Sequence, residues 1–211
     1  MFLPPNNQKS NFQTVPQGNH VAICYRLLDL GTQKNETFGS MQRRIILGFE
    51  MVELKDDDGR PMVISSNYNF SSNESATLRL HLEAWRGKKF TDSDFGDGGF
   101  DIKTIVGVPC ILSVTHKPKK TGDGVWAEIS SIAGLPKSME VPAIENEKQI
   151  VVLDKADFDP AAFETVPEYY KEKMKVSPEW AELISRPSSE HGGAVMAGHS
   201  AARNEADAIP F

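Results

Sequence analysis

The sequence predicts a mainly β domain in which five strands are joined by turns and one helix lies between the third and fourth strands. Five segments before residue 135 alternate apolar and polar residues with the two-residue period of a half-buried strand. Between the third and fourth segments, apolar residues recur at helical spacing instead. A small open sheet of the α+β class is the competing architecture. The strand lengths, and the lack of a second long helix before residue 150, favour a barrel.

The first three strands follow residues 1–18, which are rich in Asn, Gln and Pro and are expected to form an N-terminal arm. Their ranges are 20–31, 41–54 and 62–70. In the second strand the apolar side chains occupy odd positions, from 45 to 51. Because side chains alternate across a strand, Glu50 is expected on the opposite, polar face.

A helix is expected after the third strand, with Ser71 as its cap and Glu74 three residues later, which is the capping-box pattern. Gly87 ends it, because glycine adopts the left-handed conformation of a helix C-terminus at little cost. The expected buried stripe consists of Leu78, Leu82 and Trp85.

A polar loop at 88–99 and a short helical turn at 100–106 lead to the last two strands, 108–115 and the strand that starts at Val125. The resulting order, three strands, a helix and two strands, is that of the five-stranded oligonucleotide-binding (OB) barrel. We expect this OB domain to cover residues 19–140.

The sequence pattern changes after residue 136, from strand-like alternation to mainly helical composition. Residues 141–187 are expected to form a helical appendage docked on the barrel, with a short strand at 150–153. Its helices are expected at 160–163, 168–174 and 178–184, and its docking side chains are Tyr169, Tyr170, Met174, Trp180 and Leu183. Residues 188–211 have too few large apolar groups to fold alone and are expected to be a disordered acidic tail.

Charge is distributed unevenly along the chain. Residues 1–135 carry 15 Lys and Arg against 15 Asp and Glu, whereas residues 136–211 carry 8 against 14, so the whole net charge of −6 comes from the last third. A neutral domain with local basic patches can bind phosphates, and an acidic tail can compete for those patches or attract a basic partner.

Several functional classes are disfavoured. The sequence contains no apolar run of 18 residues, so no membrane span is expected. The N-terminus lacks the basic and apolar regions of a secretion signal. Cys24 and Cys110 lie in strand-like apolar contexts and are expected to be buried thiols rather than metal ligands. Phosphate-loop, dinucleotide, nucleophile-elbow and zinc-protease motifs are absent, so we expect neither catalysis nor a cofactor or metal.

Basic and aromatic residues instead point to nucleic acid. The loop between the last two strands carries three lysines in four positions, and Trp126 follows on the face opposite the apolar one. Cations for phosphates beside a ring for base stacking are what a groove for single-stranded nucleic acid needs. In an OB barrel, strands two and three and the two flanking loops form that groove. The expected DNA-binding residues are Lys34, Phe38, Arg43, Arg44, Tyr68, Phe70, Lys117, Lys119, Lys120 and Trp126.

The chain ends in Ile209-Pro210-Phe211, preceded by Glu205 and Asp207. An acidic stretch with this apolar tip, after a low-complexity linker, resembles the tail of bacterial-type single-stranded DNA-binding proteins. The resemblance implies that these five residues bind a basic-rimmed apolar pocket on replication and repair partners.

A second resemblance covers about residues 15–140. It is carried by Leu30-Gly31-Thr32-Gln33, by Leu78-Arg79 and Glu83-Ala84-Trp85-Arg86-Gly87-Lys88 within 64–90, by Phe100-Asp101-Ile102 and by Leu135-Pro136-Lys137. These segments are similar to a family of tailed-bacteriophage single-stranded DNA-binding proteins. The resemblance implies a role in phage DNA replication or recombination in the cytoplasm of the bacterial host.

The sequence therefore predicts a non-catalytic single-stranded DNA-binding protein that recruits replication or recombination proteins through its C-terminal tip, without a membrane partner. Two alternatives stay open at this point. One is a recombination accessory protein that anneals strands, and the other is a protein–protein adaptor barrel that binds no nucleic acid.

Overall fold

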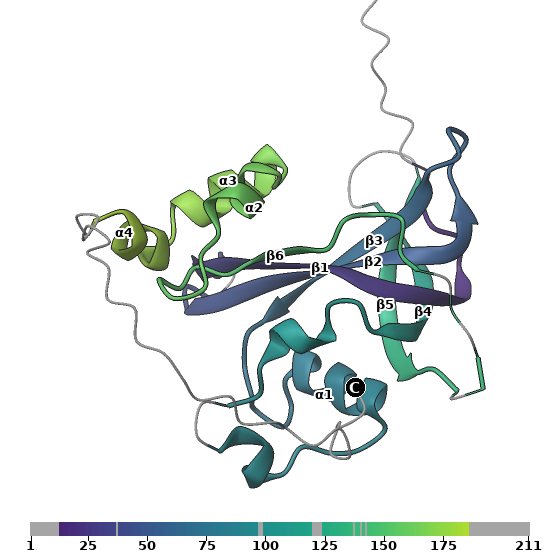
Figure 1. Ribbon diagram of the computed structural model, residues 1–211, viewed down its shortest axis with the longest axis horizontal. Coiled ribbons are helices and arrows are strands. Elements are labelled where there is room, and N and C mark those ends of the chain that lie inside the picture. The colour runs from purple at the N-terminus through teal and green to yellow at the C-terminus, as the bar shows by residue number, and fades with distance from the viewer. Residues whose placement is uncertain are drawn as a thin grey trace, which may run out of the picture.

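The structure is a computed structural model, and it describes residues 13–36, 38–96, 99–119, 124–136, 138–139, 141 and 143–185. In this part of the chain a six-stranded sheet has the spatial order β3-β2-β1-β4-β5, with β6 paired to β1 (Figure 1). All pairs are antiparallel except the parallel β1–β6 pair. The strands are β1 (Gly18–Lys34), β2 (Met41–Lys55), β3 (Pro61–Asn69), β4 (Pro109–Pro118), β5 (Val125–Gly134) and β6 (Gln149–Val151).

The expected mainly β class and the order of three strands, a helix and two strands are confirmed. The two ends of the strand path approach each other, because β3 also contacts β5. The helices are α1 (Thr77–Arg86), α2 (Pro160–Glu164), α3 (Glu168–Lys175) and α4 (Pro178–Ile184), and two 3-10 turns are η1 (Asp92–Phe95) and η2 (Ile102–Ile105).

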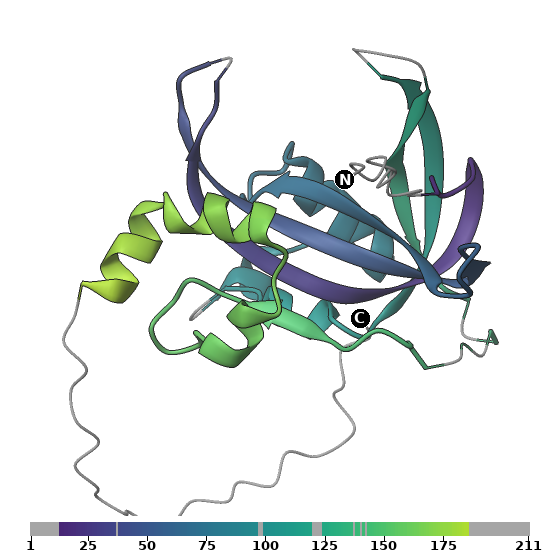
Figure 2. The same ribbon diagram turned by 90° about the horizontal axis from the view of Figure 1, so that it is seen from above.

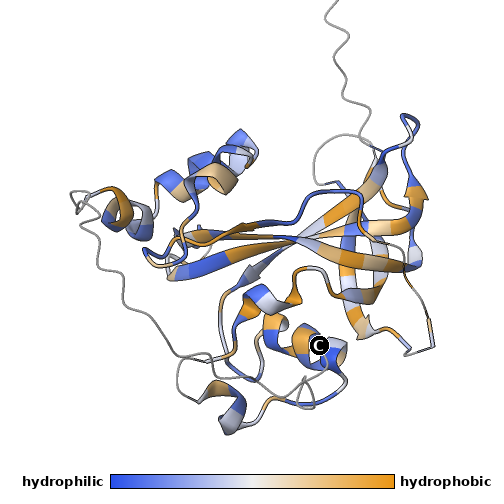
Figure 3. Cartoon of the chain, in the orientation of Figure 1, coloured by the Kyte–Doolittle hydropathy of each residue, from blue (hydrophilic) through white to orange (hydrophobic). Residues whose placement is uncertain are grey.

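Two apolar clusters lie on opposite faces of the β1–β2 pair. Leu27 and Leu47 belong to the larger cluster, which includes the buried side of α1, whereas Leu28, Leu30 and Ile46 belong to a smaller cluster with the appendage helices. Figure 1 shows α1 on one side of the sheet and α2–α4 on the other, and Figure 3 shows hydrophobic residues along much of the central strands. β1 and β2 are thus covered on both faces.

This two-sided burial encloses Glu50, which lies on the face of β2 that the sequence predicted. Its carboxylate is buried and accepts hydrogen bonds from the backbone N–H groups of Glu145 and Asn146 at 2.8 Å, and from the Asn146 side chain at 2.6 Å. The alternation along β2 was correctly predicted, but the polar face is covered by the segment that leads into β6.

The start of α1 also differs from the expectation. The helix begins at Thr77, and its N-cap residue Ala76 makes no side-chain capping bond. Ser71 and Asn73 instead accept bonds from backbone N–H groups two residues ahead, which stabilises turns in competition with the helix. The stripe of Leu78, Leu82 and Trp85 and the left-handed Gly87 end are confirmed.

The remaining sequence expectations divide similarly. Cys24 and Cys110 are free and buried as predicted, and burial raises the pKa of Cys24 to about 12. Val15, within the expected arm, is buried in the larger cluster.

The appendage docks through most of the predicted side chains. Met174 is buried, with Tyr170, Trp180 and Leu183 packed around the smaller cluster, but Tyr169 is 63% exposed and does not dock. Among the described residues, no helix combines the length and the apolar character needed to cross a bilayer.

The appendage contacts β1 through polar bonds near Gly31. The Glu179 carboxylate accepts from the backbone N–H of Thr32 at 2.8 Å and from its hydroxyl at 2.6 Å. A Cβ added at Gly31, whose φ is +67°, would lie 2.5 Å from Cβ and Oγ of Ser177. Glycine at position 31 therefore permits both the backbone conformation and the close approach of α4.

We predict that Gly31→Ala lowers the free energy of unfolding by about 3 kcal/mol, because a left-handed alanine and an overpacked contact each cost about 1–2 kcal/mol. Gly39→Ala is the matched control: it has the same φ of +67°, but no described atom lies within 4 Å of the added Cβ. Urea denaturation measures both variants. Equal losses in the two variants would show that the Gly31–Ser177 contact contributes nothing.

Candidate nucleic-acid groove

Two hairpins project from the sheet in the same direction, as Figure 2 shows. One joins β1 to β2 and the other joins β4 to β5. The hairpin groove, a cavity of about 750 Å³, is lined by β2, β3, the start of α1 and β5. Its lining side chains include Gln42, Arg43, Arg44, Asn67, Tyr68, Asn69, Phe70, His81 and Glu128.

The β4–β5 hairpin brings a cation and an aromatic ring together. Lys117 is directly opposite Trp126, and Thr115 is opposite Glu128, so these side chains share one face of the hairpin. Trp126 is 48% exposed, and Glu128 on the same face lines the groove. The ring therefore lies beyond the groove wall, on the face that continues into the groove.

The charge on this hairpin is partly compensated. Lys117 forms an ion pair with Glu128, which sequence reasoning did not include in the site. Lys119 is exposed beside the hairpin tip, where its backbone N–H donates to the Gly124 carbonyl at 3.1 Å. Lys120 lies outside the described residues.

The β1–β2 hairpin presents the second group of predicted residues. Lys34, the last residue of β1, is exposed, and Phe38 in the connecting loop is 82% exposed. The backbone N–H of Phe38 donates to the Asn35 side chain at 3.3 Å. Neither residue is among those that line the hairpin groove, and both belong to the hairpin that projects beside it.

Arg43 and Arg44 both line the groove, but in different environments. Arg43 donates from Nε and Nη2 to the buried carboxylate of Asp29, at 3.2 and 2.5 Å, and its guanidinium carbon lies 5.8 Å from the centre of the Phe70 ring. The hydrogen bond with Asp29 raises the pKa of Arg43. Within the described part of the chain, Arg44 makes a single long bond of 3.5 Å, to Asn67, so its guanidinium is less constrained.

Tyr68 cannot act as the base-stacking platform that the sequence suggested. It is 3% exposed, belongs to the larger core cluster, and its hydroxyl lies 3.0 Å from Nδ1 of His81. Burial raises the pKa of Tyr68 to about 12, so the phenol stays protonated. Phe70, which directly follows β3, is 44% exposed and lines the groove, so it is the aromatic ring from this segment that a ligand can reach.

Sequence reasoning missed the polar residues of the groove. Gln42, Asn67, Asn69 and His81 are ordinary polar residues in sequence, and only the approach of α1 to β3 and β5 brings them together. Gln42 Oε1 is buried without a hydrogen-bond partner among the described residues. The alternation of β2 placed Gln42 on the same face as Arg44, which is the one signal that could have identified it.

The predicted residues thus form one site only in part. Arg43, Arg44 and Phe70 line the groove, while Lys34, Phe38, Lys117, Lys119 and Trp126 belong to the two hairpins beside it. The predicted partner-binding residues Glu205, Asp207, Ile209, Pro210 and Phe211 lie outside the described residues. Within the described ranges, no group of His, Cys, Asp and Glu has the arrangement of a metal site.

Comparison of the chain with protein-family models and with curated proteins found no match.

Burial of His81 makes stability depend on pH. Burial lowers the pKa of His81 below its ordinary value of 6.5, and a hydrogen bond with the Ser130 backbone works in the opposite direction. The unfolded chain therefore binds this proton more readily than the folded chain. The contribution is fully present above about pH 6.5 and is lost as the pH falls from there through the folded pKa.

We predict that the wild type loses more unfolding free energy than His81→Gln between pH 7.5 and pH 5, by at most about 1.4 kcal/mol for each pH unit. Glutamine retains a polar partner for Tyr68 but does not titrate. Urea denaturation across this pH range measures the difference, and His20→Gln controls for loss of a histidine outside the groove. Parallel pH profiles for wild type and His81→Gln would contradict the prediction.

Proposed function

We propose that this protein is a non-catalytic, sequence-tolerant single-stranded DNA-binding protein. The observation that carries the proposal is the pair of hairpins flanking a groove, with Trp126 exposed opposite Lys117 on one hairpin and Phe38 exposed on the other. Arg43, Arg44 and Phe70 at the groove add charge and a third ring between them. Unpaired bases can stack on such rings while the cations contact phosphates.

The proposal includes an OB barrel as the framework. Its support is the strand order β3-β2-β1-β4-β5, the contact of β3 with β5, and the position of α1 between β3 and β4. In OB barrels, ligand lies across strands two and three between the loops that join strands one to two and four to five. The hairpin groove is lined by residues of β2 and β3, which supports the proposal.

The chemistry of the site favours a single strand over a duplex and favours many sequences over one. A duplex keeps its base faces stacked inside, so exposed rings add nothing to its binding. Lysine and arginine contacts to phosphates carry no sequence information. The bond between Arg43 and Asp29 also fixes one groove arginine before any ligand arrives, which reduces the ordering cost of binding.

The biological setting is proposed from the two sequence resemblances. The likeness of residues 15–140 to tailed-phage single-stranded DNA-binding proteins supports a role in phage replication or recombination in the host cytoplasm, where the protein protects single strands. The Ile209-Pro210-Phe211 tip, with Glu205 and Asp207, supports recruitment of partner proteins.

We predict that Trp126→Ala weakens binding of a fluorescent oligo-dT by about 1–3 kcal/mol, the scale of one stacked base. Wild-type tryptophan fluorescence should fall when DNA is added, and affinity should fall as salt rises because phosphate contacts release counterions. Tyr169→Ala removes an exposed ring from the appendage and serves as the matched control. Equal affinity of the wild type for duplex and single strand would refute the proposed function.

We further predict that removal of residues 205–211 leaves the unfolding temperature unchanged and keeps or slightly raises DNA affinity at low salt. The removed segment carries the side-chain carboxylates of Glu205 and Asp207, which compete with phosphates for basic groups. Binding of replication or recombination partners from the host should be lost in a pull-down. A lower unfolding temperature with partner binding retained would instead make Phe211 part of the fold.

A further inference from the structure

The hairpin groove continues past Phe70 into two further cavities. The first, called here the apolar slot, measures about 410 Å³ and lies against the buried face of α1, with Leu78, Leu82 and Phe95 in its walls. It shares Phe70 and Ser71 with the hairpin groove. A strand that leaves the groove over Phe70 therefore reaches the slot directly.

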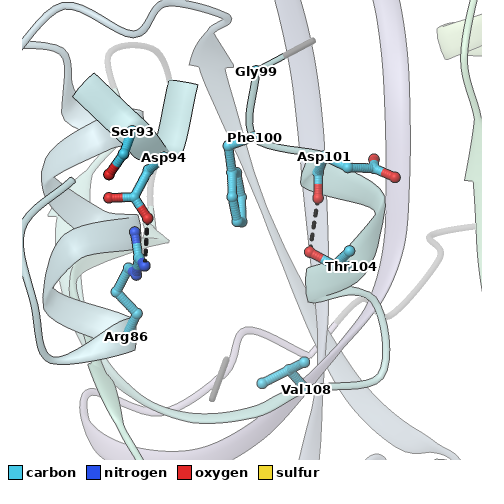
Figure 4. Close-up of a pocket in the computed structure, with 8 residues that line it drawn as sticks. All are labelled: Arg86, Ser93, Asp94, Gly99, Phe100, Asp101, Thr104 and Val108. Atoms are coloured by element: carbon cyan, nitrogen blue, oxygen red, sulfur yellow. Dashed lines mark hydrogen bonds and ion pairs between the residues drawn. The ribbon is translucent and has the colours of Figure 1, made fainter. Parts of the chain in front are cut away.

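The second cavity, the Phe100 hollow, measures about 640 Å³ and shares Gly99 and Phe100 with the apolar slot. Figure 4 shows Arg86 and Asp94 on one wall, Asp101 and Thr104 on the opposite wall, and the Phe100 ring between them. The ring is half-buried and meets Phe90 edge-on, with centroids 5.1 Å apart. Phe100 is thus an anchored aromatic ring that borders both cavities.

Arg86 is the unusual residue of this hollow. Its side chain is 2% exposed, and Nη2 donates to Asp94 at 2.9 Å while the guanidinium lies 4.4 Å over the Phe90 ring. Nε and Nη1 are buried and have no hydrogen-bond partner in the part of the chain that the structure describes. Buried donors without acceptors are costly, so an acceptor-bearing ligand beside Arg86 would be stabilised.

The charges around Arg86 decide which acceptor fits. Hydrogen bonds from Thr91 and Arg86 hold the pKa of Asp94 far below its usual range, so Asp94 is ionised and neutralises Arg86. Asp101 adds a second carboxylate to the lining. An anion such as phosphate would meet two carboxylates in the lining, and each is already paired with a cation, Asp94 with Arg86 at 2.9 Å and Asp101 with Lys103 at 3.9 Å. A neutral, flat ring with carbonyl acceptors avoids this repulsion and can stack on Phe100.

We propose that the apolar slot and the Phe100 hollow bind one nucleobase of the strand that passes Phe70, with the base stacked on Phe100 and its carbonyl edge toward Arg86. This inference rests on the proposed function and extends it by a base-binding position outside the two hairpins. Thymine, cytosine and guanine carry ring carbonyl groups, whereas adenine does not. The subsite therefore favours a carbonyl-bearing base over adenine within an otherwise sequence-tolerant interface.

The proposal is tested with the full-length protein by combining single substitutions in the protein with single changes in the DNA. Oligo-dT strands that each contain one abasic position are titrated by fluorescence anisotropy. At one position, toward an end of the bound segment, the abasic site should weaken wild-type binding about fivefold or more, as expected for the loss of one stacked base. Phe100→Ala should weaken binding of intact oligo-dT by a similar factor and should be insensitive to that abasic position. Trp126→Ala should retain the sensitivity, and Tyr169→Ala should behave as wild type.

Adenine in place of thymine at the same position should weaken wild-type binding, and guanine should not. If Phe100→Ala weakens intact and abasic strands by the same factor, the subsite is refuted. Such uniform weakening with a lowered unfolding temperature would mean that Phe100 is structural only.

Wild-type protein supplies a readout that does not depend on a variant. A 4-thiothymidine at the sensitive position, irradiated in the complex, should crosslink within residues 90–105. Crosslinks confined to the two hairpins would overturn the proposal. Thymidine monophosphate that binds at Phe100 when oligo-dT does not would assign the hollow to a free nucleotide, and would also refute the inference.

The proposed function and the additional base subsite are refuted by different results. No binding of oligo-dT by the wild type refutes the proposed function itself. Binding that depends on Trp126 but shows no coupling between Phe100 and an abasic position refutes only the additional base subsite.

Discussion

The carboxylate of Asp29 joins the three parts of the molecule on which the site depends. It is buried, and it accepts bonds from the Gly31 backbone at 2.9 Å, from the Leu153 backbone at 3.1 Å and from two nitrogens of Arg43. These donors come from β1, from the segment after β6 and from β2. A buried carboxylate is tolerated only when such donors compensate its lost hydration, so each partner holds the others in place.

This arrangement explains why an appendage on one side of the sheet matters to a groove at its edge. The register shift of β1 between Asp29 and Gly31 is a bulge of the kind that bends a strand. Next to this bend Thr32 donates to Glu179 of α4, and beyond it the β1–β2 hairpin projects from the sheet. Arg43 is bound by Asp29 within this bend. The appendage therefore supports both the wall of the hairpin groove and the orientation of one of its arginines.

The groove is moderate in charge rather than strongly basic. Glu128 lies at its β5 wall and pairs with Lys117, while Arg43 is engaged by Asp29. In the proposed function, aromatic stacking then contributes a larger share of the affinity than phosphate neutralisation, which limits nonspecific attraction to duplex DNA. The same compensation applies at Arg86 and Asp94, where a buried, locally neutral pair suits a base better than a phosphate.

The sequence alone determined the local structure of this protein, because period-two alternation and short-range turn chemistry depend only on neighbouring residues. It predicted the five main strands, the α1 stripe and the appendage helices, and it placed Arg43, Arg44 and Phe70 at the groove. Only the tertiary structure decided which polar face is buried. Glu50 faces the segment after β5, Tyr68 turns into the core toward His81, and Arg86 is enclosed beside Phe100, since each of these contacts joins residues from separate elements.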